Sequence, residues 1–229
     1  MTEYFLPPHV HFCSRGDDFV FLDLQQDDYI LVNGKAAAAL HTLSLAAGAG
    51  ETKPEFADAL RELLQGGLLT TDRSKGKDLH ATTATLAMEP LLDPENAPRI
   101  RLSPLHIYRF IAASTTAAIR MHRIQLDKTV RAVKLRKAHH TSRQGFDMDR
   151  ARDLTAIFQT LRALFPRNYL CLYDSLALLE FLARYRVFPT WVFGVRLEPW
   201  AAHCWVQEGQ FVFNEGVEEA AAYTPIMTI

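Results

Sequence analysis

The stretch "FPRNYLCLYDSLALLEFL", residues 165–182, decides how the second half of this chain folds. Pro166 ends the helical pattern that precedes it, because proline cannot continue a helix. A new amphipathic, leucine-rich helix is predicted from about Cys171 to Tyr185. Cys171 would then lie in the first turn of this helix, where it is either a core residue or a nucleophile.

The start of a helix can activate a thiol. Its free backbone N–H groups and the positive end of the helix dipole favour a thiolate, and the same N–H groups can stabilise an oxyanion. Taken alone, a cysteine at a helix start is more often a small buried apolar residue. A catalytic interpretation of Cys171 therefore requires a general base elsewhere in the sequence.

A base is available in "AAHCWVQEGQFVFNEG", residues 201–216, which follows a predicted strand and turn in residues 188–200. This segment predicts a β-hairpin with a tight turn at Glu208-Gly209. Counting pairs outward from that turn places His203 opposite Asn214. A one-residue bulge would place a carboxylate there instead.

That carboxylate belongs to Glu215. Cys171, His203 and either Asn214 or Glu215 would then provide a nucleophile, a base and an orienting group, in this order along the chain. The neighbouring Cys204 is expected to point to the opposite face of the strand from His203 and to serve packing. The residues therefore predict a cysteine hydrolase.

Composition limits the alternatives. The 229 residues are 48% apolar and 22% charged, so the chain can bury a sizeable core. A net charge of −1 gives no global attraction to nucleic acid or to an anionic membrane, and neither is expected as a partner. Three cysteines without a CxxC spacing argue against a disulfide framework or a structural metal site.

The same features suggest where the protein works. The start of the chain, "MTEYFLPPHVHF", lacks the basic and continuously apolar segments of a signal peptide, and no window approaches 18 uninterrupted apolar residues. With reduced thiols, a cytoplasmic location is expected. No metal and no cofactor are expected.

The N-terminal part predicts an α+β module over residues 1–75. Residues 11–33, "HFCSRGDDFVFLDLQQDDYILVN", contain three short β-rich runs separated by turn residues, as in a three-stranded meander. Two helices should follow, one over Gly34–Leu45 and one from about Pro54 to the glycines at 66 and 67. This order predicts a small winged-helix-like domain.

The remainder divides into a linker and a larger domain. Residues 76–100 lack clear periodicity and are predicted to be a linker with at most one short strand or helix. Residues 101–229 form the second domain. Ser103 is a plausible N-cap with Pro104 at the first helical position. The basic run in residues 120–143 is interpreted as a solvated helix face that balances acidic charge elsewhere, in preference to a phosphate or acidic-substrate site.

Residues 171–215 resemble a known family. The segments "CLYDSLALLEFLARYRVFPTWVFGVR" and "AAHCWVQEGQFVFNE" are similar to the "CL..SLAL..LL.R.G", "GVR" and "HAWVE..G..VND" motifs of the transglutaminase-like leader peptidase of lasso peptide biosynthesis, the B protein. The similarity covers about residues 150–216. It implies a transglutaminase/papain-like cysteine peptidase domain. The N-terminal module resembles the precursor-recognition domain of ribosomal peptide pathways.

The resemblance implies one activity for both domains. The first would bind the leader of a ribosomally made lasso precursor, and the second would cut the leader off before macrolactam cyclisation. An asparagine-synthetase-like cyclase is implied as a partner, and ATP use is assigned to it. Glu215 takes the place of the family's aspartate as orienting residue. Two alternatives remain open: a transglutaminase-like acyltransferase with the same triad, and a non-enzymatic peptide-binding adaptor.

The leader is expected to bind to an edge of the meander. The run "DDYILVN", residues 27–33, should lie at a sheet edge beside the apolar face of the second helix, so that an extended peptide could add a strand. Residues of the run could equally be ordinary core residues. The predicted leader-binding side chains are Tyr29, Ile30, Leu31, Phe56, Leu60 and Leu64.

Overall fold

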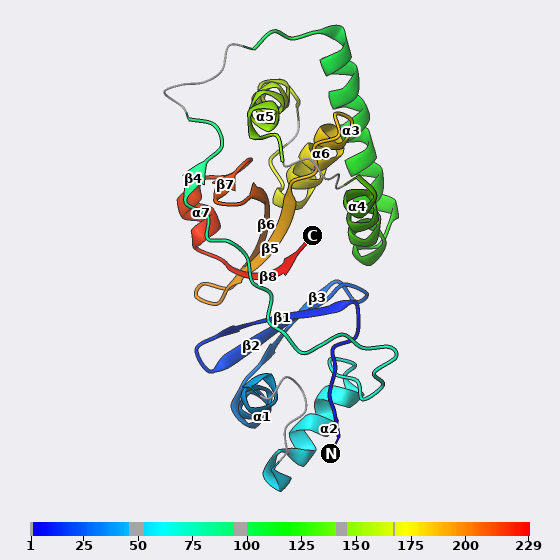
Figure 1. Ribbon diagram of the computed structural model, residues 1–229, viewed down its shortest axis with the longest axis vertical. Helices are drawn as coiled ribbons and strands as arrows, with labels where there is room; N and C mark the ends of the chain where they lie inside the picture. The colour runs from blue at the N-terminus through cyan, green and yellow to red at the C-terminus, as the bar shows by residue number, and fades with distance from the viewer. Residues whose placement is uncertain (1, 46–52, 94–99, 141–145, 167) are drawn as a thin grey trace. The chain divides into compact units, whose positions relative to one another are not determined.

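The computed structural model describes residues 2–45, 53–93, 100–140, 146–166 and 168–229 (Figure 1). The chain forms two compact units. One contains Met1–Thr83 with Thr224–Met227, and the other contains Ala84–Tyr223 with Thr228–Ile229. The first unit combines helices with an antiparallel sheet, and the second combines helices with a sheet in which β4 and β7 are parallel and the β5-β6 and β6-β7 pairs are antiparallel. The chain is therefore of the mixed α+β class, as predicted.

The first unit begins with the predicted meander. Strands β1 (Val10–Arg15), β2 (Asp18–Asp23) and β3 (Asp28–Val32) pair in the antiparallel order β1-β2-β3. The two reversals use residues with positive φ, Gly16 at 61° and Asp27 at 55°. Glycine and aspartate tolerate this region better than most residues, which explains why the "RGDD" and "QQDD" sequences form turns.

Helices cover the meander in the first unit. The structure contains α1 (Gly34–Leu45), a 3₁₀ turn η1 (Pro54–Phe56) and α2 (Ala57–Gln65), which confirms both predicted helices. Their apolar faces and one face of the sheet share a core. Its buried members include Val10, Phe12, Phe19, Phe21, Leu40, Leu43, Leu60 and Leu63.

The edge position predicted for the third run is confirmed, since β3 is the last strand of its sheet. Along this strand Leu31 is 50% exposed, Tyr29 is half-buried, and Ile30 packs against the core. Alternate residues of a strand point to opposite faces, so Leu31 and Ile30 face different ways. Leu31 is thus the most accessible apolar side chain of the strand.

The helix side of the predicted groove needs a correction. Leu60 is only 1% exposed and belongs to the core, so a leader peptide cannot contact it. The reason is that Leu60 lies at the centre of the buried face of α2, together with Leu63. Phe56 and Leu64 are partly buried and pack against the same core.

The second unit is built on a sheet with the strand order β4-β7-β6-β5. Strand β4 falls within the region predicted as a linker with one short element. Thr228, the last residue of β8, and the following Ile229 belong to this unit. Ile229 and Trp191 exchange two backbone hydrogen bonds of 3.0 Å. The strand bounds are β4 (Glu89–Pro90), β5 (Thr190–Arg196), β6 (Ala201–Glu208), β7 (Phe211–Val212) and β8 (Thr224–Thr228).

Helices surround this sheet. Ser103 caps the first of them as predicted, because its side chain accepts a hydrogen bond from the His106 N–H and Pro104 occupies the first turn. The helices are α3 (Pro104–Arg123), α4 (Leu126–His140), α5 (Met148–Ala163), α6 (Cys171–Ala183) and the short α7 (Val217–Ala221).

Helix α6 is the centre of the second unit. Every residue from Tyr173 to Leu182 is buried, because α6 packs against β6 on one side and against α3 and α5 on others (Figure 1). The predicted helix is confirmed, but the expectation of an amphipathic helix is wrong. A helix that is buried on all sides is typical of a position enclosed by other elements.

One buried carboxylate explains part of the basic run. Glu180 on α6 has only 3% of its side chain exposed. Arg136 lies 2.7 Å from its carboxylate, Arg120 lies 3.5 Å away and Arg184 lies 3.6 Å away. Arg120 and Arg136 come from the basic run, so these two residues balance an internal acidic charge, as predicted, rather than forming a solvated face.

Candidate active site

Cys171 is the first residue of α6 and is half-buried. The preceding Leu170 is extended, with φ −138° and ψ 115°, so the helix begins abruptly at the cysteine. The first N–H groups of a helix have no acceptor within the helix. The N–H groups of Cys171 and Leu172 are therefore donors at the point where the thiol lies.

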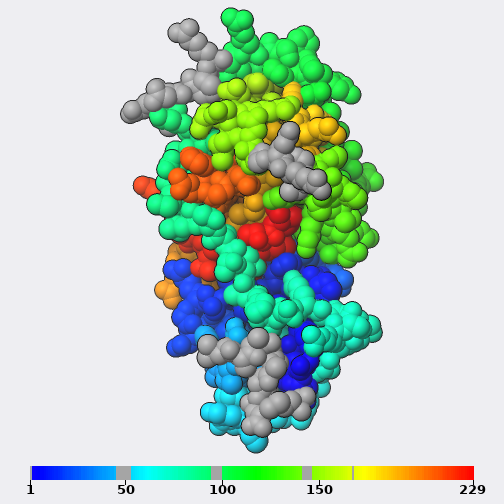
Figure 2. All heavy atoms as spheres, viewed as in Figure 1, coloured from blue at the N-terminus to red at the C-terminus, as the bar shows by residue number. Residues whose placement is uncertain are grey.

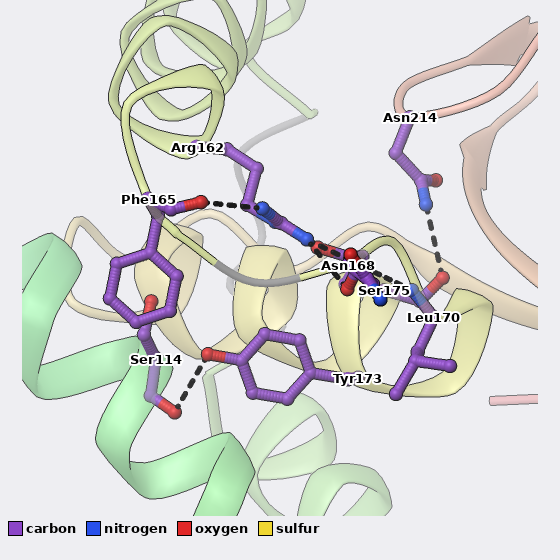
Figure 3. A network of polar contacts seen from close by, with 9 residues as sticks. Ser114, Arg162, Phe165, Asn168, Leu170, Tyr173, Ser175 and Asn214 are labelled. Carbon is purple, nitrogen blue, oxygen red and sulfur yellow. Dashed lines mark hydrogen bonds and ion pairs between the residues drawn. The ribbon is translucent and has the colours of Figure 1, made fainter.

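An ion pair holds this helix start (Figure 3). The Asp174 carboxylate accepts the Leu170 N–H at 2.7 Å and pairs with the Arg162 guanidinium on α5. Arg162 also donates to the carbonyl oxygens of Phe165 at 3.4 Å and of Asn168 at 3.2 Å. One arginine thus holds both Phe165 and Asn168, which lie between α5 and α6. These contacts explain why the buried helix α6 contains an aspartate at position 174.

The same pair matters for the charge at the site. A carboxylate in the first turn favours the helix, but it opposes a thiolate one turn away. Asp174 has 3% of its side chain exposed, and Arg162 has 15%, so their charges are screened little by solvent. Arg162 therefore neutralises Asp174, and the start of the helix can still stabilise a thiolate at Cys171.

His203 connects Cys171 to Glu215. The imidazole lies on β6 and hydrogen-bonds to the Cys171 thiol, and its Nε2 contacts the Glu215 carboxylate. The ring packs between Tyr223, with centroids 5.0 Å apart, and Trp205, at 6.1 Å. Only 11% of the His203 side chain and 13% of the Glu215 side chain are exposed. The structure thus brings together the three residues proposed from the sequence.

The register of the hairpin differs from the predicted one. Glu208 pairs with Phe211 and Gln207 with Val212, so the turn lies at Gly209-Gln210 and not at Glu208-Gly209. Gly209 has φ +55°, and glycine is the residue that a tight hairpin turn favours at its first central position. The predicted pairing of His203 with Asn214 is therefore wrong.

Asn214 has a different task. Its side-chain oxygen accepts the Val206 N–H at 2.8 Å. Its amide nitrogen donates to the Ser175 hydroxyl at 3.0 Å, as Figure 3 shows. Ser175 in turn donates to the Cys204 carbonyl at 3.1 Å. Asn214 and Ser175 thus join β6 to α6 one helical turn after Cys171. Polar residues within the otherwise apolar sequence of α6, such as Ser175, were the signal for these contacts, and the sequence analysis did not use it.

Cys204 is buried, as expected for a packing residue, with 2% of its surface exposed. It also hydrogen-bonds to Cys171, which the alternation of side chains along the strand did not predict. Burial raises the pKa of the Cys204 thiol well above its usual value. Cys204 therefore stays protonated and can donate its S–H to a Cys171 thiolate.

These contacts shift the pKa values of the two central groups in opposite directions. Hydrogen bonds from Cys204 and then from His203 lower the pKa of Cys171 to about 4. Burial lowers the pKa of His203, but its hydrogen bonds to Cys171 and Glu215 outweigh burial and raise that pKa to about 9. Near neutral pH the pair is therefore a thiolate and an imidazolium, which is the reactive form of a cysteine nucleophile.

Other site types find no support in the described part of the chain. No group of three histidine, cysteine, aspartate or glutamate side chains among the described residues could hold a metal ion. None of the described helices combines the length and the apolar character needed to cross a membrane.

The account of the helix start predicts a stability effect. Asp174→Ala leaves Arg162 without its partner and frees the Leu170 N–H, and breaking a buried ion pair costs about 3–5 kcal/mol. Urea unfolding should therefore show a loss of about 3 kcal/mol. Asp149→Ala is the matched control, because Asp149 pairs with Arg152 at 2.8 Å but is 92% exposed. It should cost less than about 1 kcal/mol. Equal losses would contradict the account.

Comparison with known protein families agrees with the geometry. Residues 111–228 match the transglutaminase-like superfamily. The matched region contains α6, β6 and the segment with Glu215, and it covers more than half of the chain. No curated protein and no solved structure matches the chain. On the superfamily match, the chain belongs to the transglutaminase-like superfamily, whose members typically use a cysteine in catalysis.

Proposed function

We propose that this protein is a cysteine peptidase that cleaves the leader from a ribosomally made lasso peptide precursor. One observation carries the catalytic part: Cys171, His203 and Glu215 form a continuous chain of contacts at the start of a buried helix. Membership of the transglutaminase-like superfamily supports cysteine-based acyl transfer. The similarity of residues 150–216 to lasso leader peptidases supports the substrate.

The first half-reaction forms an acyl-enzyme. The Cys171 thiolate attacks the carbonyl carbon at the junction of leader and core, and the backbone N–H groups at the start of α6 stabilise the oxyanion. The His203 imidazolium then gives its proton to the leaving amine as the peptide bond breaks. The core peptide departs with a free N-terminus, and the leader remains as a thioester on Cys171.

The second half-reaction restores the enzyme. His203, now neutral, takes a proton from a water molecule, and the resulting hydroxide attacks the thioester carbonyl. The carbon–sulfur bond breaks, the leader leaves as a carboxylic acid that releases its proton to water, and Cys171 and His203 return to the thiolate–imidazolium pair. Glu215 orients the imidazole and offsets its positive charge throughout the cycle.

Recognition of the leader is assigned to the first unit. The edge strand β3 offers backbone groups for strand addition, and Leu31 is its accessible apolar side chain. Tyr29, Phe56 and Leu64 are partly exposed and complete the proposed surface, together with Ile30 to a smaller extent. Affinity would come from main-chain hydrogen bonds, and specificity from the side-chain contacts.

A cyclase of the asparagine-synthetase-like kind is the proposed partner, because it consumes the freed N-terminus to close a macrolactam. The alternative activity is that of an acyltransferase, in which an amine replaces water in the second half-reaction. The superfamily match supports the peptidase and the acyltransferase equally. A non-enzymatic adaptor is disfavoured, because an adaptor would not need the connected thiolate, imidazolium and carboxylate.

The direct test expresses a short precursor-like open reading frame from the neighbourhood of this gene as the substrate and follows the products by mass spectrometry. The wild-type protein should release a core whose mass equals the precursor minus the leader, and a leader that has gained the elements of water. Cys171→Ala should abolish cleavage and should still bind the precursor with affinity within about twofold, because recognition is assigned to the other unit. Cys13→Ala serves as a matched cysteine control.

Cleavage that survives in Cys171→Ala would exclude the thiol mechanism. A leader that carries the mass of an added amine would identify the acyltransferase instead.

The assignment of the orienting residue makes a second prediction. Glu215→Gln removes the charge that stabilises the imidazolium, so turnover should fall about 10⁴-fold, by analogy with loss of the carboxylate in other triads. Asn214→Ala breaks the links to Val206 and Ser175 and should mainly lower stability. Its turnover per folded molecule should fall less than tenfold.

Turnover should therefore be normalised to the folded fraction measured by circular dichroism. If Asn214→Ala proves the more damaging variant after this correction, asparagine and not glutamate orients the histidine.

A further inference from the structure

A pocket that the catalytic contacts do not use opens beside the start of α6. It has a volume of about 410 Å³ and is open to solvent. Helix α5, the segment before α6 and the end of the β6–β7 hairpin form its walls. In Figure 2 the yellow-green atoms of α5 lie against the orange atoms of that hairpin. The lining residues are Phe158, Gln159, Arg162, Ala163, Phe165, Tyr169, Asp174 and Asn214.

Three of the lining residues are close to the catalytic groups along the chain. Tyr169 is two residues before Cys171, Asp174 is on the next turn of α6, and Asn214 precedes Glu215. Partial burial raises the pKa of the Tyr169 phenol, and the negative charges of Glu215, Asp174 and Cys171 raise it further. Tyr169 therefore lies within electrostatic range of the catalytic groups while it also lines the pocket.

The polar groups of the pocket are bonded to the protein itself. Arg162 and Asp174 neutralise each other. The side-chain amide of Asn214 donates a hydrogen bond to Ser175 and accepts one from the Val206 N–H. The Gln159 amide donates to the Phe213 carbonyl at 2.9 Å. A charged side chain that entered would lose hydration and would find both charges of the Arg162–Asp174 pair already committed to each other.

Aromatic rings provide the remaining surface. Phe165 and Tyr169, which lie between α5 and α6, contribute two accessible rings, and Phe158 on α5 contributes a ring that is 2% exposed. Aromatic pairs add about 0.5–1.5 kcal/mol beyond the burial of their area. The volume is sufficient, since a cavity of about 150 Å³ already holds benzene. The volume, the paired charges and the aromatic lining of the pocket thus all favour an uncharged aromatic group as its occupant.

We propose that this pocket is a specificity pocket that receives an uncharged aromatic side chain of the substrate, next to the bond that is cut. The proposal rests on the proposed function in that it takes Cys171 as the reacting group. It adds the chemical class of residue that the enzyme selects near the cleavage point. Tyr169 and Phe165 are its specificity-determining residues.

The test uses three chloroacetamides that differ only in a remote group: N-(2-phenylethyl), N-methyl and the cationic N-(2-aminoethyl) chloroacetamide. Each alkylates a thiolate, forming a sulfur–carbon bond as chloride leaves, and the flexible tether lets the ring reach a pocket on either side of Cys171. Modification of Cys171 is followed by mass spectrometry at pH 7. The phenylethyl reagent should react at least tenfold faster than the methyl reagent, and the aminoethyl reagent should gain nothing.

Two pocket variants and one control locate the effect. Tyr169→Ala and Phe165→Ala should each reduce the ratio of phenylethyl to methyl rates to about threefold or less. Tyr108→Ala is the control, because Tyr108 is an aromatic residue with 69% exposure on α3 and does not line the pocket. It should leave the ratio unchanged.

Equal rates for the phenylethyl and methyl reagents would overturn the proposal, as would a preference that both pocket variants retain. These outcomes are distinct from failure of the proposed function. If Cys171 reacts with all three reagents no faster than a free thiol, the nucleophile assignment fails and the pocket proposal fails with it. If Cys171 reacts fast but without preference, only the pocket proposal fails.

Discussion

The rest of the site depends on the way α6 begins. The Asp174 carboxylate holds the Leu170 N–H, and Arg162 holds Asp174 together with the carbonyls of Phe165 and Asn168. This network fixes the first residue of the helix, Cys171, at the edge of a core in which the next turns are fully buried. The thiol is therefore positioned by packing and ion pairing that involve no catalytic group.

Energetically, the site keeps a charged pair in a partly buried place. Desolvation opposes both the thiolate and the imidazolium, and the pair persists because each charge has hydrogen-bond partners. Cys204 donates to the thiolate, and Glu215 accepts from the imidazolium. Asn214 and Ser175 hold β6 against α6, so the distance between the two charges is set by the fold.

Local sequence patterns predicted much of this structure, and long-range contacts account for what they missed. The meander, the Ser103 cap and the helix that starts at Cys171 follow from turn residues, capping residues and proline, which act over a few positions. The predicted hairpin register was wrong because two adjacent turns fit the pattern, and only the backbone preference of Gly209 separates them.

The roles of Asp174, Glu180 and Cys204 depend on partners far away in the sequence, such as Arg162 and Arg136. The sequence pattern placed Leu60 on the apolar face of the second helix. The pattern could not show that the domain's own core, and not a bound peptide, would cover this residue.

The central claim, that Cys171 and His203 form a thiolate–imidazolium pair, is tested most directly by the pH dependence of Cys171 alkylation. Iodoacetamide reacts with the thiolate, so the rate follows the fraction of deprotonated thiol. With the pKa of Cys171 lowered to about 4, the rate should stay nearly constant from pH 8 down to about pH 5 and fall only below that. His203→Ala, which removes one of the two partners, should make the rate fall at higher pH. A wild-type rate that drops about tenfold per pH unit below pH 8, as for an ordinary thiol with a pKa of about 8.5, would contradict the account.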